Sequence, residues 1–374
     1  MTRTSLLQSS RSDNQGLANR LRERIQRNGP ITFYEWMKAA LYDPIDGYYR
    51  RTDRVRQGRA GDYRTAPELS PLFAATFVRY FAKLFAELGY SNELTIFEAG
   101  AGDGDFAFGV LSSLQKYHRD VFLSTTYVID EVSCDSRTRA SERLALFSER
   151  VEFRSFADLT QRAECGIIFS NELIDAFPVH RVVCRKGDLR ELWVDWQTNQ
   201  FVWIECDVTA AAVDCLQGCN IKLADGQIIE VNLDAEKFIS SAASVLKAGF
   251  VITVDYGAER AELLAAKHRF HGTLRGFRRQ QLINDPLSHP GEQDLTTTVD
   301  WTQIREAGEV AGLETVRFER LDKFLLAEGL LDELETHAAG LPDSRALRLR
   351  TSVRELIMPP GMAASFQVLV QKRT

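Results

Sequence analysis

Three glycines in one short segment are the first residues of this chain that could bind a ligand. Gly100, Gly102 and Gly104 alternate with other residues in the segment EAGAGDG, which lies between an apolar run and an amphipathic stretch. Glycines in a strand-to-helix turn let the backbone come close to a nucleotide-like ligand. The dinucleotide-binding pattern G-x-G-x-x-G needs its third glycine at position 105, where this chain has Asp105. The spacing G-x-G-x-G therefore disfavours a dinucleotide.

Negative charge in the same segment indicates which ligand would suit it. Glu98 precedes the glycines, and Asp103 and Asp105 lie in the loop or directly after it. Each contact between a pyrophosphate and one of these carboxylates would cost about 1 kcal/mol or more at an effective dielectric constant of about 20. S-adenosylmethionine (SAM) carries a sulfonium and an ammonium group but no phosphate. We therefore predict SAM as the cofactor, with Glu98 facing its ammonium group directly or through water. The alternative is a bare turn whose aspartates cap a helix.

An acidic residue after the next apolar run points to the same ligand. Glu131 directly follows the run YVID. In a Rossmann-like fold, an acidic residue at the end of the second strand holds the ribose hydroxyls of the bound nucleotide. We predict this role for Glu131, and its neighbour Asp130 is the alternative.

A third group of polar residues follows a later apolar run. In IIFSNELIDAFPVHR, Asn171, Glu172 and Asp175 come directly after residues with the pattern of a buried strand. Ligands of open α/β sheets bind beyond the carboxyl ends of the strands. We therefore expect these three side chains to face the reactive end of the cofactor. The alternative is a strand-to-helix turn that Asn171 caps.

The elements that must position these residues alternate along the chain from residue 94 onward. Helical patterns separate most of the apolar runs, and this alternation predicts an α/β fold with a parallel sheet that helices cover on both faces. The predicted strands are 94–97, 126–130, 151–153, 166–169 and 250–254, followed near the end of the chain by ETVRFER and SFQVLVQKR.

The pattern divides the chain into two parts. Residues 1–92 read as a helical segment ahead of any sheet, with helices over 16–28, 32–41 and 70–89. Residues 93–374 read as the Rossmann-like core, with insertions at about 180–225 and 258–311. The first insertion is rich in β-branched and aromatic residues, which predicts hairpins that turn at residues 186–188.

Composition excludes several classes of protein. The chain has 374 residues, of which 44% are hydrophobic and 26% charged, so it can bury a large core. A net charge of −6 leaves no electrostatic footprint for nucleic acid, and no apolar run approaches the roughly 18 residues of a membrane span. The six cysteines form no CxxC pair, which predicts reduced thiols and no metal site. We expect a cytoplasmic location, or the mitochondrial matrix in a eukaryote, because the N-terminus lacks the apolar core of a secretory signal.

Long motifs of the chain resemble those of the MidA family of SAM-dependent methyltransferases. The resemblance runs in order over roughly residues 17–371 and implies a class I methyltransferase core with a seven-stranded sheet and large insertions. The segments that carry it are GDYRTAPELSPLF, EAGAGDG, YVIDEVS, SNELIDAFPVHRV, VDYG, GTLRGF and DPLSHPGEQDLTTTVDW.

The resemblance also implies roles for individual residues. It assigns the three glycines and Glu131 to the cofactor, and Asn171, Glu172 and Asp175 to the reaction end. Thr65 and Pro67 belong to a segment, T-A-P-E here, that the resemblance places over the cofactor. Thr298 stands where relatives often have a histidine, so proton transfer by a histidine at that position is not expected.

The resemblance also bears on the methyl acceptor, because the family includes members that act on a protein. One of them, a mitochondrial complex I assembly methyltransferase, dimethylates an arginine of a peripheral-arm subunit of respiratory complex I. The resemblance therefore predicts a protein-arginine methyltransferase in which Glu172 and Asp175 grip the guanidinium group, by analogy with other arginine methyltransferases. The alternatives are a non-catalytic SAM-binding assembly factor and an NAD(P)-dependent oxidoreductase. The sequence leaves the oligomeric state open.

Overall fold

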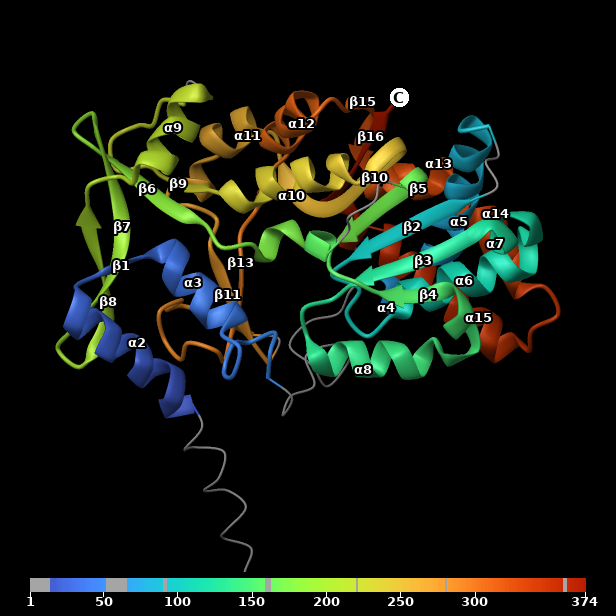
Figure 1. Cartoon of the computed structure of the whole chain (residues 1–374), viewed down its shortest axis with the longest axis horizontal. Helices are drawn as coiled ribbons and strands as arrows, with labels where there is room; N and C mark the ends of the chain where they lie inside the picture. The colour runs from blue at the N-terminus through green and yellow to red at the C-terminus, as the bar shows by residue number, and fades with distance from the viewer. Residues whose placement is uncertain are drawn as a thin grey trace, which may run out of the picture.

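The computed structural model contains three β-sheets of eight, five and three strands among its described residues. Figure 1 shows the large sheet and its helices at one end of the molecule and the five-stranded sheet at the other, with part of the three-stranded sheet between them. The structure describes residues 14–51, 66–89, 93–158, 163–219, 221–279, 281–358 and 362–374.

The large sheet has the strand order β15-β16-β10-β5-β2-β3-β4, and a short strand, β14, pairs with β10. Strands β4, β3, β2, β5 and β10 run parallel to one another, whereas β16 is antiparallel to both β10 and β15. The path therefore has seven strands, and the expected α/β fold is confirmed. The strands are β2 (Leu94–Ala99), β3 (Thr125–Asp130), β4 (Val151–Phe153), β5 (Ala163–Asn171), β10 (Leu246–Ala258), β14 (Val299–Asp300), β15 (Glu314–Arg320) and β16 (Phe366–Arg373).

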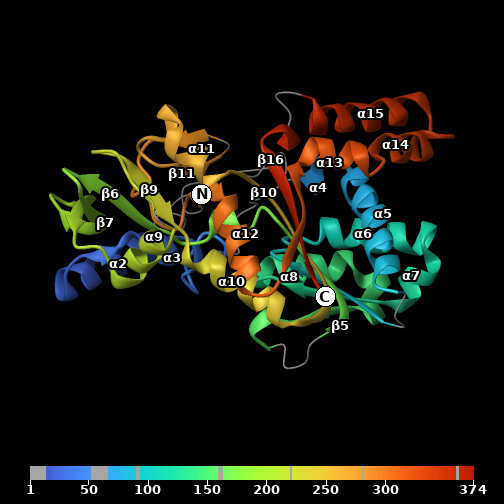
Figure 2. The same ribbon diagram turned by 90° about the horizontal axis from the view of Figure 1, so that it is seen from above.

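Alternate residues of these strands enter two separate cores, because successive side chains of a strand point to opposite faces of the sheet. On β5, Ile167 and Phe169 pack in one core and Ile168 packs in the other. The first core is filled by the helices α5 (Pro71–Glu87), α6 (Asp105–Tyr117) and α13 (Leu321–Ala327), and the second by α10 (Leu233–Ser244) and α12 (Trp301–Val310). Figure 2 shows β10 and β16 between these two layers.

Further helices lie outside these layers or in the connections. Helix α8 follows β3, and α14 and α15 precede β16. The remaining helices are α7 (Arg119–Ser124), α8 (Cys134–Arg143), α9 (Ala210–Gly218), α11 (Arg260–Ala265), α14 (Leu330–Ala338), α15 (Asp343–Ile357), and the 3-10 turns η1 (Ala145–Arg150), η2 (Phe156–Asp158), η3 (Ile174–Ala176), η4 (Lys267–Arg269) and η5 (Met362–Ala364).

The five-stranded sheet is formed mainly by the first insertion. Its order is β1-β7-β6-β9, and β8 pairs with β7. The predicted hairpin between β6 and β7 turns at Lys186 and Gly187, which both have positive φ. The strands are β1 (Ile31–Thr32), β6 (His180–Arg185), β7 (Asp188–Gln197), β8 (Gln200–Cys206) and β9 (Ile228–Val231).

The N-terminal segment differs from the sequence prediction in one respect. We expected helices ahead of any sheet, but Ile31 and Thr32 form β1, which pairs antiparallel with β7. Helices α2 (Asn14–Asn28) and α3 (Phe33–Tyr42) flank this strand, and Thr32 caps α3 in a capping box with Glu35. The ring centroids of Phe33 and Trp203 of β8 lie 4.8 Å apart, so this part of the segment packs with the five-stranded sheet.

The other half of the segment packs elsewhere. Helix α4 (Ala66–Leu69) leads into α5, which Ser70 caps and Pro71 begins, as the sequence predicted. Phe73 and Phe77 of α5 lie in the core of the large sheet. The N-terminal residues thus bridge the two ends of the molecule.

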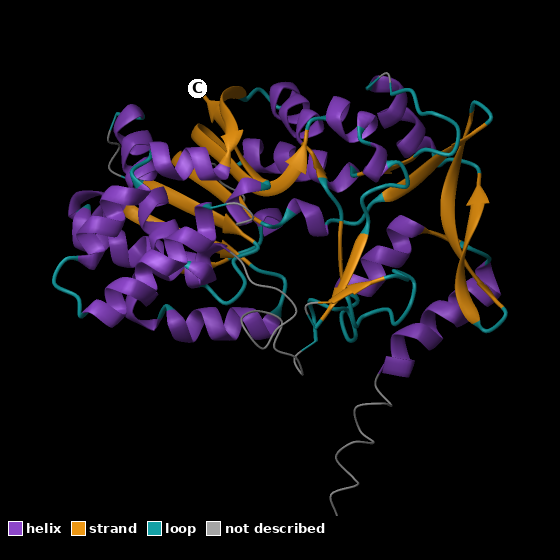
Figure 3. Cartoon of the chain, turned by 180° about the vertical axis from the view of Figure 1, so that it is seen from behind, coloured by secondary structure: helices purple, strands orange, loops and turns teal. Residues whose placement is uncertain are grey.

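The second insertion forms the three-stranded sheet, in the order β12-β11-β13. All pairings within it are antiparallel. Figure 3 shows the strand-rich end of the molecule opposite the helices that surround the large sheet. The strands are β11 (Arg275–Arg278), β12 (Gln281–Ile283) and β13 (Asp294–Thr296). No helix within the described ranges is long and apolar enough to cross a membrane.

Candidate cofactor and acceptor site

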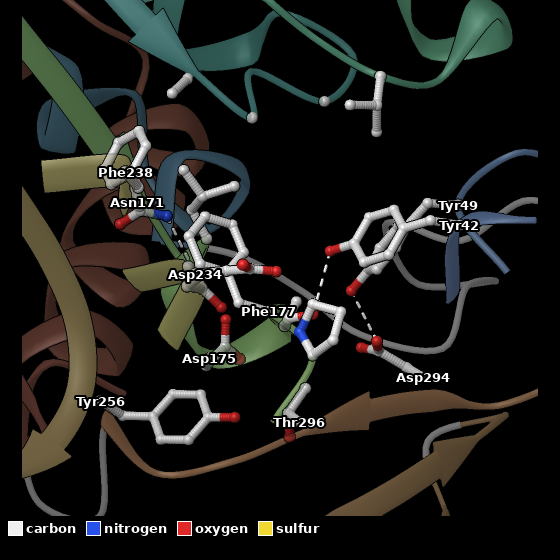
Figure 4. A pocket seen from close by; sticks show the side chains of 18 of the residues that line it. Tyr42, Tyr49, Asn171, Asp175, Phe177, Asp234, Phe238, Tyr256, Asp294 and Thr296 are labelled. Carbon is white, nitrogen blue, oxygen red and sulfur yellow. Dashed lines mark hydrogen bonds between the residues drawn. The ribbon is translucent and has the colours of Figure 1, made fainter. Parts of the chain in front are cut away.

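A cavity of about 1220 Å³ lies at the carboxyl ends of the parallel strands. The glycine loop and the residues after β3 and β5 line one part of it, and residues of α3 and of the three-stranded sheet line another. Figure 4 shows side chains from these elements directed into one space. The position agrees with the rule that open α/β sheets bind ligands at this edge.

The three glycines all have a left-handed backbone, with φ of 72° at Gly100, 55° at Gly102 and 79° at Gly104. Gly100 and Gly102 line the cavity, whereas Gly104 caps α6 and does not. A Cβ at Gly104 would lie 3.0 Å from the Cβ of Ala140. Gly104 therefore permits close packing of two helices, and the first two glycines present backbone to the cavity.

Glu131 lines the cavity directly after β3. Its Oε2 accepts a hydrogen bond of 2.8 Å from the backbone N–H of Gly102, and its Oε1 accepts one of 2.7 Å from Ser133. These bonds fix the carboxylate between the glycine loop and α8. A carboxylate has about four lone-pair sites, so a side chain held in this way can also accept bonds from hydroxyl groups.

Asp130, the alternative ribose ligand, lines the same cavity but faces another segment. Its Oδ2 accepts a 2.9 Å hydrogen bond from the backbone N–H of Phe156. Burial raises the pKa of Asp130. The two neighbouring acids thus point to different parts of the cavity wall.

Glu98 lies behind the loop and does not line the cavity. Its Oε2 accepts a 2.7 Å hydrogen bond from the hydroxyl of Tyr127, and burial raises its pKa to about 8. The contact with the cofactor's ammonium group that we predicted for Glu98 would therefore have to run through the backbone or through water.

The two aspartates of the loop are paired with arginines of α8. Nε of Arg139 donates to Asp103 at 2.7 Å, and Arg143 pairs with Asp105. We expected both carboxylates to repel a pyrophosphate as unpaired charges. Because an arginine balances each of them, Asp103 and Asp105 exclude a pyrophosphate less strongly than expected.

Asn171 ends β5, Glu172 directly follows it, and the two line the cavity together. Glu172 has a φ of 51°, which is uncommon for a residue with a side chain, and its N–H donates to the carbonyl of Val254 on the neighbouring strand at 2.9 Å. Its Oε1 accepts bonds from Nδ2 of Asn171 at 3.1 Å and from the N–H of Ala66 at 3.4 Å. Burial, followed by the charge of Asp175, raises the pKa of Glu172 to about 8.

Asp175 lies in the turn η3 and is also buried against the cavity. Burial raises its pKa to about 6, although a hydrogen bond from Tyr256 and the charge of Arg275 lower it. The guanidinium of Arg275 lies 4.9 Å from the ring centroid of Tyr256. In Figure 4 the hydroxyl of Tyr256 points toward the space between Asp175 and Thr296.

A third buried acid, Asp255 of β10, holds the turn that carries Asp175. Its Oδ2 accepts hydrogen bonds from the backbone N–H groups of Leu173, Ile174 and Asp175 at 3.3, 3.0 and 3.3 Å. Asp255 does not line the cavity. It therefore positions the turn from behind.

Tyrosines of the N-terminal part complete the wall. The rings of Tyr42 and Tyr49 stack with centroids 5.4 Å apart. The hydroxyl of Tyr42 donates to the carbonyl of Ala176 at 3.0 Å, and that of Tyr49 donates to Oδ1 of Asp294 at 2.7 Å (Figure 4). These contacts join α3 and the loop after it to η3 and β13.

Comparison with known proteins identifies the family. The model of the family described as "Putative S-adenosyl-L-methionine-dependent methyltransferase" matches residues 76–319, which is more than half of the chain. The chain belongs to this family. The resemblance to the MidA family is thereby confirmed, and the chain is a SAM-dependent methyltransferase.

Two curated relatives are similar over almost the whole chain. The Drosophila melanogaster protein named "Protein arginine methyltransferase NDUFAF7 homolog, mitochondrial" is 26% identical over 398 residues, which cover 94% of this chain and 84% of the relative. The Danio rerio protein arginine methyltransferase NDUFAF7 is 25% identical over 390 residues, which cover 96% and 87%.

Two solved structures from Burkholderia thailandensis have the same fold. One, bound to S-adenosyl-homocysteine, superposes with a TM-score of 0.86 at 30% identity and covers 97% of this chain and 93% of its own. The other, a native structure, superposes with a TM-score of 0.84 at 30% identity and covers 97% and 92%. The predicted class I fold and the predicted cofactor are confirmed, and the nicotinamide alternative is set aside.

The residues of the cavity fit SAM. Gly100 and Gly102 expose backbone to the cavity. A Cβ at Gly100 would lie 2.9 Å from Cδ1 of Leu173, so a residue with a side chain would collide with Leu173 at this position. The fixed carboxylate of Glu131 would be available to the cofactor's hydroxyl groups, and the aromatic side chains of Phe156 and Phe238, with ring centroids 6.0 Å apart, also line the cavity. SAM supplies a methyl group on a sulfonium. The chain's own contribution is to align the acceptor with that group, since alignment provides much of the catalysis of an in-line displacement.

Some predicted residues lie apart from this group. Thr65 is outside the described residues, and Pro67 of α4 does not line the cavity. Thr298 lines the cavity, where its Oγ1 accepts a 3.3 Å bond from Arg275. No group of metal-binding side chains occurs within the described ranges.

Sequence reasoning assigned no role to five residues of the site: Tyr42, Tyr49, Tyr256, Arg275 and Asp294. Tyr42 and Tyr49 lie in the segment YDPIDGYYR, and the other three lie in motifs that carried the family resemblance. The only sequence signal for their role was that each is an aromatic or charged residue within such a segment. The periodicity of apolar residues does not indicate which distant segments of the chain meet.

Proposed function

We propose that this methyltransferase transfers methyl groups to the guanidinium of a protein arginine. The observation that carries the proposal is a cluster of hydrogen-bond acceptors at the reaction end of the cavity. Glu172 and Asp175 contribute carboxylates, and Oδ1 of Asn171 is buried without a hydrogen-bond partner among the described residues. A guanidinium has five N–H donors and no acceptor, so it is complementary to such a cluster.

The charges of the site support a cationic acceptor. Burial raises the pKa of Glu172 to about 8 and that of Asp175 to about 6, so both carboxylates are costly to ionise on their own. A bound guanidinium would stabilise their charged forms, and two carboxylates can orient one of its nitrogens toward the sulfonium. Methylation of a cationic guanidinium releases one proton, and Glu172 is the group of the cluster best suited to receive it.

The size of the cavity supports a protein substrate. Its volume of about 1220 Å³ exceeds the range of roughly 300–1,000 Å³ that is usual for a pocket that holds one small molecule. The N-terminal helices and the three-stranded sheet supply the additional wall. This space suits the cofactor together with the side chain of a larger partner.

The curated relatives support the same substrate class, because their names are those of protein arginine methyltransferases. The family resemblance further suggests a peripheral-arm subunit of respiratory complex I as the partner. The test is mass spectrometry of that subunit from cells with and without this chain. We expect a methylated arginine that disappears without the chain and returns with the wild-type chain but not with Glu172→Gln. Methylation that persists without the chain would exclude this substrate.

A further inference from the structure

A second hollow of about 870 Å³ lies between α15 and the start of α5. We call it the α15 groove. Its walls come from α15, from the segment around α4, from the glycine loop and from the end of α8. Figure 2 shows α15 on the outside of the molecule, beyond α13 and α14. None of the residues of α15 lines the main cavity.

Four arginines of α15 are exposed: Arg345, Arg348, Arg350 and Arg354. None of them forms an ion pair with another described residue, although most other arginines of the described chain do. The helix carries two acids, Asp343 and Glu355, so the arginines outnumber them. This is a local excess of positive charge on a chain whose net charge is −6.

Two of the arginines face the groove. Arg345 and Arg348 line it, together with the acids Glu68, Asp103, Asp105 and Glu355. The charges of Asp103 and Asp105 are already balanced, because Arg139 and Arg143 pair with them. Arg345 and Arg348 therefore remain able to bind carboxylates from outside.

Exposed apolar side chains line the groove together with these arginines. Leu347 is 63% exposed and Leu341 is 36% exposed, and both line the groove. An exposed leucine between two arginines offers a partner both an apolar contact and ion pairs. The chemistry of the groove thus matches a segment that combines acidic and apolar residues.

The groove lies close to the reaction end of the site. Oγ of Ser352 on α15 donates to Oγ of Ser70 at 3.1 Å, and Ser70 directly follows the four residues of α4. At the other end of α4, the N–H of Ala66 contacts Glu172. Four helical residues span only about 6 Å, and Asp103 lines both the groove and the main cavity.

We propose that the α15 groove docks an acidic segment of the protein whose arginine is methylated. Arg345 and Arg348 pair with carboxylates of that segment, and Leu347 contacts an apolar residue within it. The proposal rests on the proposed function, since it requires a protein acceptor. It adds a contact outside the reaction site that selects the partner by charge.

The test compares two double variants of the full chain. Arg345→Glu with Arg348→Glu reverses the charges of the two α15 arginines that line the groove, and Arg350→Glu with Arg354→Glu makes the same change on α15 outside the groove. Each protein receives radiolabelled SAM and a protein extract from cells that lack this chain. We expect the groove variant to label protein at least about tenfold more slowly than wild type, and the control variant to stay within about twofold. Calorimetry should show that the groove variant and the control variant bind SAM with wild-type affinity, and hence that both variants fold.

Salt provides a second measure. Raising the ionic strength screens ion pairs on the surface, so it should lower the wild-type rate toward that of the groove variant and leave the groove variant nearly unchanged. Equal rates for wild type and the groove variant, or equal losses in both variants, would overturn the docking proposal alone. A wild-type chain that labels no protein would overturn the proposed function and the docking proposal with it.

The same variants distinguish a protein partner from a lipid surface. Sedimentation with phosphatidylserine vesicles measures membrane binding directly. If the groove variant lost vesicle binding but labelled extract proteins as wild type does, the groove would be a membrane contact, and the proposal would be wrong.

Discussion

Nδ2 of Asn171 donates to Oε1 of Glu172 at 3.1 Å, while Oδ1 of the same amide is buried without a partner among the described residues. A buried polar atom without a hydrogen bond is costly, so a bound donor is its expected complement. The pair therefore presents an oriented carboxylate and an unused acceptor to the same cavity.

Glu172→Gln should separate binding from catalysis. The amide keeps the size of the side chain but removes the negative charge, so SAM affinity should stay within about threefold of wild type and methyl transfer should fall at least about 100-fold, a loss of roughly 3 kcal/mol or more. Asp234→Asn is the matched control, because Asp234 lines the same cavity but pairs with Tyr34 and Lys237. Full activity of Glu172→Gln would remove its proposed role.

Glu131→Ala should weaken SAM binding by about 2–4 kcal/mol if its carboxylate accepts two ribose hydroxyls. That loss corresponds to roughly 30- to 700-fold in Kd, measured by calorimetry. Asp130→Ala tests the alternative, since Asp130 bonds to Phe156 and not to the glycine loop. A large loss with Asp130→Ala and none with Glu131→Ala would reverse the assignment.

Gly102→Val should abolish measurable SAM binding in a protein that still folds. Gly102 has a φ of 55° and lines the cavity, and a β-branched residue avoids that backbone conformation. Gly187→Val is the control, because Gly187 also has a positive φ but lies in the hairpin turn with no atom within 4 Å of an added Cβ. Both variants should lose stability on thermal unfolding, and only the first should lose the cofactor. Wild-type affinity in Gly102→Val would mean that the loop does not contact SAM.

Glu98 makes the stability of the chain depend on pH. Burial raises its pKa to about 8 in the folded chain, from 4.5 as the ordinary value. Because the pKa is higher in the folded chain than in the unfolded chain, protonated Glu98 stabilises the folded chain. Its contribution to the free energy of unfolding is complete below pH 4.5 and is lost as the pH rises to 8. The loss is at most about 1.4 kcal/mol for each unit of difference between the two pKa values. Glu98→Gln keeps an acceptor for Tyr127 but cannot ionise.

Urea unfolding at pH 5 and pH 9 measures this effect. The free energy of unfolding should fall less between these two values in Glu98→Gln than in wild type. Glu172→Gln should reduce the fall as well, because the pKa of Glu172 is raised in the same way. If the free energy of unfolding fell equally between pH 5 and pH 9 in Glu98→Gln and in wild type, Glu98 would be ionised in the folded chain throughout this range.

Arg275 should set the acidic limb of the pH–rate profile. Its charge lowers the pKa of Asp175, which is about 6 in its presence. Arg275→Gln removes the cation, so the pKa of Asp175 should rise and the acidic limb should move to higher pH. Arg269→Gln is the control, since Arg269 lines the same cavity but pairs with Glu262. Identical profiles for wild type and Arg275→Gln would show that Asp175 does not act as a carboxylate in the reaction.

The local pattern of apolar residues was sufficient to predict most strands of the large sheet. Each of the first five predicted strands lies within a strand of the structure, because apolar runs such as Ile167–Phe169 are buried on both faces and have few other arrangements. The helix that Ser70 caps also appears where the sequence placed it. These elements depend on near neighbours in the chain.

The remaining features depend on contacts between distant segments. Ile31 and Thr32 form a strand only because β7 lies beside them, and Tyr49 reaches the site only because it bonds to Asp294. The pairing of Asp103 with Arg139 was missed for the same reason, since nothing in the glycine segment indicates that α8 turns its arginines toward it. The sequence predicted which side chains of β2 alternate between the two faces, but not which residues they contact. Glu98 therefore accepts a hydrogen bond from Tyr127 instead of lining the cavity.

The most direct measurement of the proposed activity is the chemical identity of the labelled residue. Purified chain is incubated with methyl-labelled SAM and a protein extract, the proteins are hydrolysed, and the labelled amino acids are separated by chromatography. We predict label in methylated arginine for the wild-type chain and at least about 100-fold less for Glu172→Gln, with SAM affinity unchanged. Label in lysine or in a small molecule, with none in arginine, would contradict an arginine methyltransferase.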